Sequence, residues 1–311
     1  MIIHAVVVTY NRLELLKCCL EKLFAQTYGL NRIIVVNNAS TDGTKEYLKL
    51  ISKDPRMVVI NLKKNLGGAG GFYHGVKRAY ELGCDHIWLM DDDTMPEPNA
   101  LEELIRGLDH IGAEKVGFLG SNVLYKDGSP CIMNISRAVK RWNDHFADGL
   151  VEVFHSSFVS MLIPSAVVEK VGLPIREYFI WGDDAEYSTR IIRAGYPGFM
   201  VSGSTVYHYM SENAGIDIFT ASPERLDRFY YFYRNITTTD RLRGLRTFIP
   251  RLMYHAFIVL KILFSKTDHK LKKSAVVIKG TVAGMFKKVR IEAVKKRDVT
   301  FKTFRENKEK E

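Results

Sequence analysis

The sequence predicts an α/β protein with a sheet of mostly parallel strands and helices packed against it. Strand-like and helix-like segments alternate through residues 1–91, an order that implies right-handed crossovers between parallel strands. The strand-like segments are nearly continuous β-branched runs, as expected for strands buried on both faces. With 311 residues, of which 46% are hydrophobic, the chain can bury one large core or two smaller ones. Neither disorder nor a fibrous repeat fits this composition.

Seven elements can be assigned in the first part of the chain. Apolar β-branched runs predict four strands, at residues 2–10, 32–40, 57–65 and 86–90. Apolar residues at helical spacing predict three helices between them, at residues 12–26, 43–52 and 71–83. Ligands of such sheets bind outside the carboxyl ends of the strands. The polar loops that follow the four strands should therefore gather at one edge and form a ligand site.

The second half of the chain is predicted to be mixed. Residues 101–108 have a helical pattern, and strand-like runs at 116–125 and 151–163 are joined by a basic, irregular middle. A short helix, a polar block containing "WGDDAEY" and a strand-like run at 198–209 come next. Beyond about residue 225 the pattern is helical. We therefore predict an α/β domain over residues 1–240 and a basic amphipathic helical extension over residues 241–311.

Positive charge is concentrated in the extension. Residues 241–311 hold 20 Lys and Arg against 6 Asp and Glu, whereas residues 1–240 hold 25 against 29. The extension is therefore a candidate for contact with an anionic membrane, for packing on the main domain, or for forming a homo-oligomer. One face of its first helix is apolar: Ala256, Val259, Leu260 and Leu263. Lysines lie around and beyond that face: Lys261, Lys266, Lys270, Lys272 and Lys273.

The chain is expected to lack both a leader and a membrane span. The most apolar late segment, "MYHAFIVLKILF", has twelve residues, fewer than the roughly 20 that a spanning helix needs. The start "MIIHAVVVTY" has neither a basic leader nor a cleavage site. The four cysteines have no C-x-x-C spacing and are interpreted as reduced thiols. These features predict a cytoplasmic protein that is at most peripheral on the inner face of the membrane.

Three adjacent aspartates, Asp91, Asp92 and Asp93, follow the fourth predicted strand. Like charges beside an apolar interior repel one another and lose hydration, so they destabilise the fold unless a cation balances them. One interpretation is a hydrated loop that caps the helix beginning near Asn99. The other is a metal site, because an Asp-x-Asp pair can chelate a hard divalent ion through oxygen while the middle residue faces elsewhere.

A second acidic cluster consists of Asp183, Asp184 and Glu186. In one interpretation it begins a helix, where carboxylates complement the helix dipole. In the other it supplies a general base, while the first cluster holds a metal ion. His208, in the last strand-like run, is either a third metal ligand or a structural histidine.

The glycine-rich segment "NLGGAGGFYHG" matches neither the dinucleotide fingerprint nor the phosphate loop. Its residues without β-carbons either let the backbone approach a ligand closely or form only a turn and a helix start. Farther along, Phe229, Phe232 and Tyr233 share one helical face and should pack in a core. Arg234 and Asn235 are then free to reach a sugar or a phosphate from the rim.

Five motifs, in this order and with these separations, resemble family 2 glycosyltransferases with the GT-A fold: "VVVTYNR", "VVNNASTDGT", "NLGGAGGF", "LMDDDTMPEP" and "WGDDAEY". Within that family the chain looks most like the galactofuranosyltransferases, which have close rhamnosyltransferase relatives. The resemblance covers residues 1–240 and implies a GT-A mixed sheet flanked by helices. It also implies inverting transfer of a sugar from a nucleotide diphosphate donor to a hydroxyl of a glycan or lipid-linked acceptor, assisted by Mn²⁺ or Mg²⁺. The donor would be UDP-galactofuranose first and dTDP-rhamnose second.

The resemblance also implies roles for particular residues. The nucleotide sugar would contact Thr9, Tyr10, Arg12, Asn38, Asn65, Gly67, Gly68 and Asp92. The metal ion would be held by Asp91, Asp93 and His208. Asp184 would be the general base, and the acceptor pocket would be shaped by Trp181, Asp183 and Glu186. "NNAS" stands where many relatives have "DDGS", so Asn38 leaves the base open between uridine and thymidine.

The chemistry of the reaction supports two separate acidic clusters. In a single displacement the base takes a proton from the attacking hydroxyl on the side of the anomeric carbon opposite the diphosphate, so base and metal must lie apart. Two rival functions are a nucleic-acid-binding protein that uses the basic extension and a metal-dependent phosphohydrolase. The acidic loops would repel a nucleic acid, so we expect no such partner. A phosphohydrolase leaves the glycine-rich loop and the second acidic cluster unexplained. We therefore expect an enzyme of cell-surface polysaccharide synthesis.

Overall fold

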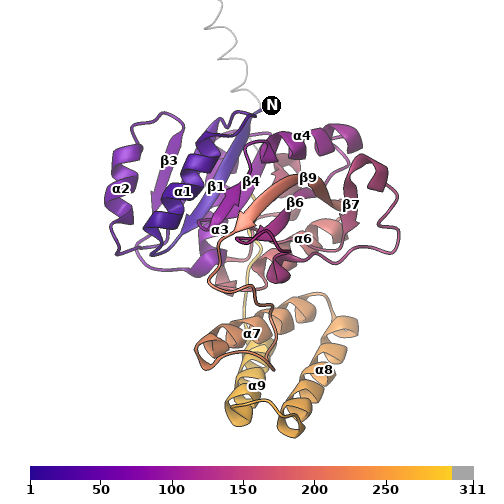
Figure 1. Cartoon of the computed structure of the whole chain (residues 1–311). Coiled ribbons are helices and arrows are strands. Elements are labelled where there is room, and N and C mark those ends of the chain that lie inside the picture. The colour runs from indigo at the N-terminus through magenta and orange to yellow at the C-terminus, as the bar shows by residue number, and fades with distance from the viewer. Residues whose placement is uncertain (296–311) are drawn as a thin grey trace, which may run out of the picture.

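The computed structural model describes residues 1–295, and its first part follows the predicted alternation (Figure 1). The four strands are β1 (Ile3–Thr9), β2 (Arg32–Asn37), β3 (Met57–Asn61) and β4 (His86–Asp91). Between them lie helices α1 (Leu13–Phe24), α2 (Thr44–Ile51) and α3 (Gly67–Glu81). The strands are parallel and lie in the order β3-β2-β1-β4. The predicted α/β fold class is confirmed.

The second half of the chain extends the same sheet on the β4 side. The added strands are β5 (Thr94–Pro96), β6 (Phe118–Tyr125), β7 (Leu150–Val153), β8 (Met161–Pro164) and β9 (Gly198–His208). Strand β8 is antiparallel to both β4 and β6, whereas β6 and β9 are parallel. Strands β5 and β7 each pair with β9 in the antiparallel direction. The result is one mixed sheet of nine strands.

Two predictions for this half are wrong. Residues 151–163 do not form one strand, because β7 and β8 pair with different strands and the segment between them bends away. Serines make this bend polar: Ser156 N donates to Ser188 Oγ at 3.2 Å, and Ser160 Oγ accepts from Trp88 Nε1 at 2.9 Å. The segment after β4 is not all loop, because it contains β5. Short 3₁₀ turns lie in other connections: Ile132–Asn134, Phe146–Asp148, Arg176–Tyr178 and Pro223–Arg225.

Helices cover both faces of the sheet. On one face α1, α2 and α4 (Ala100–Ile111) bury residues such as Leu20 and Leu104. On the other face α3, α5 (Ser165–Val171) and α6 (Asp183–Arg193) bury residues such as Val76 and Ile191. The sheet therefore lies between two apolar cores, which explains why its central strands are apolar on both faces.

Helix α3 begins at Gly67, earlier than the predicted residue 71, and packs directly on β1. A Cβ added at Gly71 would lie 2.3 Å from Val8 Cγ1, and one at Gly75 would lie 2.2 Å from Val6 Cγ1. At these two positions glycine is needed for close helix–sheet packing. Part of the glycine-rich pattern therefore reflects the core and not a ligand.

Three further helices form a unit beneath the sheet in Figure 1: α7 (Leu226–Leu242), α8 (Leu245–Phe264) and α9 (Lys270–Phe286). Phe229 and Tyr233 of α7 are buried and Phe232 packs beside them, which confirms the predicted packing face. Lys273 is also buried, so its predicted place at the surface is wrong. Its Nζ donates to Phe219 O at 2.9 Å and pairs with Asp268 Oδ1 at 2.5 Å.

Helix α8 is longer than its most apolar segment suggested. It has 20 residues, and its most apolar window has a mean hydropathy of 1.4 and is 17% buried. Among the helices of residues 1–295, α8 is the one that is long and apolar enough to cross a membrane, by length and composition. Helix α8 is thus longer than the twelve residues considered in the sequence, and the expectation that it does not span a membrane stays a prediction.

Residues 287–295, which we call the strap, run back from α9 to the α/β domain (Figure 1). The Glu292 carboxylate accepts hydrogen bonds from Tyr73 Oη at 2.5 Å and Lys77 Nζ at 2.8 Å, both on α3. The Glu292 carbonyl accepts from Leu173 N at 2.8 Å. The helical unit is thus attached to the α/β domain at both of its ends. Residues 296–311 of the predicted extension lie outside the described residues, and the predicted boundary at residue 240 stays a prediction.

Candidate active site

The aspartates after β4 lie at the carboxyl edge of the sheet, beside the loop that follows β1. Strands β1 and β4 are paired so that Val8 lies opposite Asp91. Arg12, from the β1 loop, donates through Nη1 to Asp92 Oδ1 at 3.4 Å and, more closely, to Asp93 Oδ2. Both aspartate side chains are buried. The structure therefore brings the first and fourth predicted loops together, as the parallel order requires.

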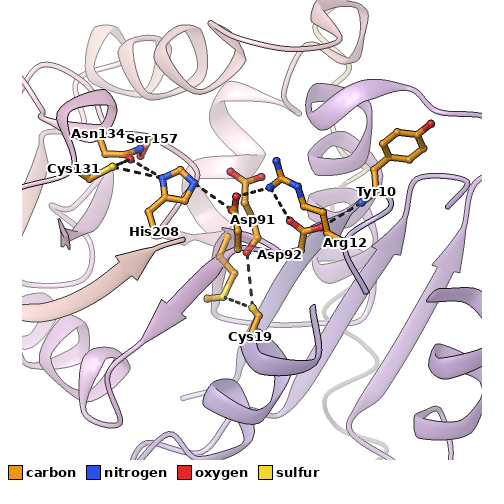
Figure 2. Close-up of polar contacts among 11 residues, drawn as sticks. Tyr10, Arg12, Cys19, Asp91, Asp92, Cys131, Asn134, Ser157 and His208 are labelled. Atoms are coloured by element: carbon orange, nitrogen blue, oxygen red, sulfur yellow. Dashed lines mark hydrogen bonds and ion pairs between the residues drawn. The ribbon is translucent and has the colours of Figure 1, made fainter. Parts of the chain in front are cut away.

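His208 reaches the same aspartates from the other side (Figure 2). It is the last residue of β9, and the short strand β5 places Thr94 opposite it. His208 Nε2 lies 3.2 Å from Asp93 Oδ1, and Tyr209 N donates to Asp93 O at 2.8 Å. Asp93 thus lies between His208 and Arg12. Strand β5, which was not predicted, pairs with β9 and so brings Asp93 next to His208.

Burial and mutual repulsion shift the pKa values of these groups. Burial, followed by the charge of Asp93, raises the pKa of Asp91 and that of Asp92 to about 7. Burial also acts to raise the pKa of Asp93, but His208 and Arg12 outweigh it and lower that pKa. Burial acts to lower the pKa of His208, but the hydrogen bond to Asp93 raises it to about 10. His208 and Arg12 balance the negative charge of Asp93, but they balance the charges of Asp91 and Asp92 less well. A further cation would therefore be favourable here.

Asp91, Asp93 and His208, which we call the metal-ligand group, fit a divalent ion. One ligand atom from each lies within 4.8 Å of the other two. Carboxylate oxygens suit Mg²⁺ and Mn²⁺, and an imidazole nitrogen suits transition metals. The residues that the sequence proposed as metal ligands are therefore close enough to share one ion.

Side chains that sequence reasoning missed hold His208 from behind (Figure 2). Asn134 Oδ1 lies 2.9 Å from His208 Nδ1, and Cys131 Sγ lies 3.8 Å from the same atom. Asn134 Nδ2 donates in turn to Ser157 Oγ at 2.8 Å. Such contacts orient a metal-binding histidine and fix which ring nitrogen faces the ion. These residues come from irregular connections, where no periodicity or motif marks them.

Asp184 lies apart from the metal-ligand group, in the first turn of α6. Burial raises the pKa of Asp184 to about 6, against the effect of Ala185 N, which donates to Asp184 Oδ1 at 2.7 Å. Burial, then Asp184, and to a smaller extent Asp91 raise the pKa of Asp183 well above its ordinary value. The charge of Asp91 acts on Asp183, so the two acidic clusters lie near each other. The second acidic cluster does begin helix α6, so the interpretation that its carboxylates complement the helix dipole is also consistent with the structure.

The loop before α6 is strained. Phe179 and Trp181 have φ values of 66° and 62°, which residues other than glycine rarely adopt. Asn235 of α7 supports them, because its Nδ2 donates to the carbonyls of Tyr178, Ile180 and Trp181 at 2.9, 3.0 and 2.7 Å. Backbone strain of this kind persists only where the surroundings enforce it, and it gathers at functional sites.

Arg234 and Asn235 do not reach the rim of the site, so that prediction is wrong. Both side chains are buried. Arg234 Nη2 donates to the carbonyls of Glu177 and Tyr178 at 3.0 and 2.7 Å. The two residues hold the loop that carries Trp181.

Trp181 itself packs against α7. Its ring centroid lies 5.2 Å from that of Phe229, and the Arg225 guanidinium lies 5.7 Å from the Trp181 centroid. The tryptophan is only partly buried. It therefore presents an aromatic surface next to the start of α6.

Several residues predicted to contact the donor are engaged within the protein. Asn38 Oδ1 accepts from Leu66 N at 2.8 Å, and Asn38 Nδ2 donates to Gly67 O at 2.9 Å. A Cβ at Gly67 would lie 2.0 Å from Phe179 O, whereas Gly68 has nothing within 4 Å of that position. Gly67 therefore allows close contact between two loops, and Gly68 offers open backbone.

The remaining predicted residues lie nearby, and their roles stay predictions. Thr9 ends β1 and is buried, and Tyr10 after it is exposed while its N donates to Asp92 Oδ2 at 3.3 Å. Asn65 Oδ1 accepts from the backbone N of residue 67 at 2.7 Å. Glu186 is buried and bound by Arg190 Nε at 3.0 Å, so its carboxylate is used inside the domain.

A second set of potential metal ligands, His110, His145 and Asp148, lies between the end of α4 and the start of β7. It borders a cavity of about 440 Å³. His110 Nε2 lies 3.0 Å from Asp148 Oδ2, and both residues are exposed. A surface contact between His110 and Asp148 accounts for this group without a metal ion.

Comparison with known sequences points to a sugar-transfer family. Residues 4–151 match the family described as Glycosyl transferase family 2. The galactofuranosyltransferase GlfT1 of Mycolicibacterium smegmatis is 27% identical over 266 residues, which are 80% of this chain and 86% of that protein. GlfT1 of Mycobacterium tuberculosis is 29% identical over 204 residues, which are 63% of this chain and 66% of that protein.

Solved structures share the fold at low sequence identity. GalNAc-T7, crystallised with UDP, GalNAc and Mn²⁺, has a TM-score of 0.60 and 15% identity over 78% of this chain, which spans about half (48%) of that protein. The mannosyltransferase PcManGT of Pyrobaculum calidifontis, solved with GDP-Man and Mn²⁺, has a TM-score of 0.52 and 16% identity over 92% of this chain and 76% of its own. These likenesses confirm the predicted GT-A mixed sheet flanked by helices.

Proposed function

We propose that the protein transfers a sugar, with inversion, from a nucleotide diphosphate donor to an acceptor hydroxyl, because residues 4–151 match Glycosyl transferase family 2. The observation that carries this proposal is the presence of two separate acidic clusters near each other. The metal-ligand group lies at the carboxyl edge of the sheet, and Asp184 lies on α6. An inverting displacement needs base and departing diphosphate on opposite sides of the anomeric carbon.

Asp184 is the proposed base. With a pKa of about 6 it is mostly ionised at neutral pH, yet it is more basic than an ordinary carboxylate. Its oxygen takes the proton of the acceptor hydroxyl while the acceptor oxygen bonds to the anomeric carbon. The bond from that carbon to the diphosphate breaks in the same step, and the nucleoside diphosphate leaves with the electron pair.

The metal-ligand group would hold Mn²⁺ or Mg²⁺, and the solved relatives that contain Mn²⁺ support a divalent ion. Such an ion supplies positive charge that stabilises a departing diphosphate. Arg12 places a permanent cation against Asp92 and Asp93, at the same edge. Asn134 keeps His208 oriented through its Nδ1. The open backbone at Gly68 would lie along the donor.

We infer that the donor sugar is galactofuranose, carried by UDP, because the matched curated relatives are named galactofuranosyltransferases. Rhamnose carried by dTDP is the second candidate. The acceptor would be a hydroxyl of a glycan or a lipid-linked intermediate in cell-surface polysaccharide synthesis. The enzyme would work in the cytoplasm, on the inner face of the membrane.

A donor panel tests the proposal. Full-length protein is incubated with UDP- and dTDP-sugars, with Mn²⁺ and with EDTA, and consumption of each donor is measured. We expect metal-dependent consumption of UDP-galactofuranose, lost in Asp91→Asn and kept in the control Asp127→Asn, which changes an exposed aspartate outside the site.

Two outcomes would contradict the proposal. Consumption of no nucleotide sugar, together with metal-independent and salt-sensitive binding of oligonucleotides, would favour the nucleic-acid-binding rival. Release of phosphate from simple phosphate esters, with no sugar transfer, would favour the phosphohydrolase.

A further inference from the structure

Helices α8 and α9 each expose a stripe of large apolar side chains. On α8 the stripe recurs every three or four residues: Leu245, Ile249, Met253, Phe257, Leu260 and Phe264. On α9 it consists of Leu271, Ile278, Val282 and Phe286. This spacing places each stripe on one side of its helix. Isolated exposed apolar residues are ordinary, but contiguous patches mark contact surfaces.

The contacts of the two helices place both stripes on the side away from α7. Helix α8 turns His255 inward, where its Nδ1 lies 2.8 Å from Thr281 Oγ1 of α9. Helix α9 turns Gly280 and Gly284 toward α7, where an added Cβ would lie 2.7 and 2.4 Å from backbone oxygens. On each helix the stripe residues lie on the side opposite these inward-facing residues. We call the two stripes together the apolar face of the α8–α9 hairpin.

Cations surround the apolar face. Residues 241–295 contain 14 Lys and Arg, and their two acidic residues are Asp268 and Glu292. Both acids are paired within the molecule, with Lys273 and Lys77 respectively. Exposed basic residues remain on and around the helices: Arg246, Lys261, Lys266, Lys272, Lys279 and Lys288. Basic side chains beside an apolar helical face are typical of helices that bind anionic lipid surfaces.

We propose that the apolar face docks on the surface of an anionic bilayer, with α8 and α9 lying in the plane of the membrane. A spanning α8 fits less well, because its other side packs on the unit through Ile258 and Ile262 and pairs Arg251 with Asp240 of α7 at 2.6 Å. A second copy of the chain fits less well too, because it would bring two strongly positive surfaces together.

Vesicle sedimentation of the full chain tests this inference. The test variant is Leu245→Ser with Leu260→Ser, at two stripe leucines that are 73% and 54% exposed. The matched control is Leu50→Ser, at a leucine on α2 that is 66% exposed. We expect wild type and control to bind vesicles containing phosphatidylglycerol, more weakly at high salt and weakly to pure phosphatidylcholine. The double variant should bind anionic vesicles about tenfold more weakly or worse, since two apolar side chains no longer enter the interface.

Three results would overturn the inference. Equal binding by the double variant and wild type would remove the apolar face from membrane contact. Resistance of the bound protein to alkaline carbonate would show a spanning helix. A dimer that the double variant loses, without vesicle binding by wild type, would assign the face to a second copy. Unchanged melting temperatures confirm that the variants fold. Donor consumption should be unchanged in all of them, so this test is separate from that of the transfer reaction.

Discussion

Single residues at the site differ in charge because their surroundings differ. Asp93 is held between His208 and Arg12, which keeps its pKa below the ordinary value despite burial. Asp184 is half-buried, no basic side chain is among the groups that shift its pKa, and that pKa rises to about 6. One carboxylate is therefore a stable anion suited to hold a cation, and the other can exchange a proton near neutral pH.

Replacing Asp184 by Asn should nearly abolish transfer. The amide has the same shape but cannot accept the proton, and general-base catalysis typically contributes about 10²–10⁴-fold. Binding of Mn²⁺ and UDP, measured by calorimetry, should stay close to wild type because the metal-ligand group is untouched. If Asp184→Asn keeps more than about a tenth of wild-type turnover, a different group is the base.

With saturating Mn²⁺, which would keep Asp91 ionised, the raised pKa of Asp184 should set the acidic limit of activity. Its ionised form is the active one, so kcat/KM with a soluble acceptor should fall as the pH drops through about 6. Below that point the rate should decrease about tenfold per pH unit. A pH–rate profile at constant ionic strength measures this, with circular dichroism to show that the protein stays folded. A fall only near pH 4, the ordinary value for aspartate, would contradict the assignment.

The sequence placed Asp91, Asp93 and His208 at one site, where the structure brings them together, but it misjudged how deeply other side chains are buried. The residues of the metal-ligand group were each marked by their place at the end of a strand. Asn134, which orients His208, lies in an irregular connection and has no such mark. Arg234 and Asn235 were placed at the rim because helical periodicity gives a direction and not the distance to the surface.

At the scale of elements, α7 and the loop before α6 depend on each other. Asn235→Ala would remove the hydrogen-bond partner of the Ile180 and Trp181 carbonyls. The Tyr178 carbonyl would keep its hydrogen bond from Arg234 Nη2. Unsatisfied buried groups typically cost about 1–3 kcal/mol, so we expect about 2 kcal/mol lower free energy of unfolding, measured in urea. The exposed control Asn143→Ala should change it little. A loss below about 0.5 kcal/mol would mean that the strained loop does not need this support.

The contact between α3 and β1 is a second element-level test. Gly71→Ala adds a Cβ 2.3 Å from Val8 Cγ1, whereas Gly29→Ala adds one with nothing within 4 Å. Overpacking typically costs about 1–3 kcal/mol, and we expect it to exceed the roughly 1 kcal/mol by which alanine favours a helix. Thermal unfolding of the two variants compares them directly. Equal stability would show that α3 can shift away from β1 without cost.

The helices and strands of the first half were predictable because the apolar residues of each follow a single helical or strand periodicity. Each also packs against its neighbours in the chain. The parallel order follows from crossovers between neighbouring strands. β5 has only three residues, two prolines stand in the segment that contains it, and its strand character depends on pairing with β9, more than a hundred residues later. Such pairing is a tertiary effect that local pattern does not contain.

For the whole molecule, metal and nucleotide binding should be linked to stability. Ligands that bind only the folded state raise its free energy of unfolding by about 2.7 kcal/mol at 100 times their dissociation constant. We expect UDP to raise the melting temperature with Mn²⁺ present and much less after EDTA treatment. His208→Ala should reduce the metal-dependent part. A UDP shift that is the same with and without Mn²⁺ would separate nucleotide binding from the metal-ligand group.

The strap restricts how far the helical unit can move relative to the α/β domain. A helical unit joined by one connection could swing, but this unit is joined through the start of α7 and again through Glu292, which is fastened to α3. With the apolar face on a bilayer, the helical unit would be a rigid spacer that holds the α/β domain at a fixed distance from the membrane. The distance from lipid to Asp184 would then be constant, and the length of the acceptor would decide which hydroxyl arrives there. The fixed distance between the membrane surface and Asp184 would then select acceptors by their length, independently of the contacts inside the pocket.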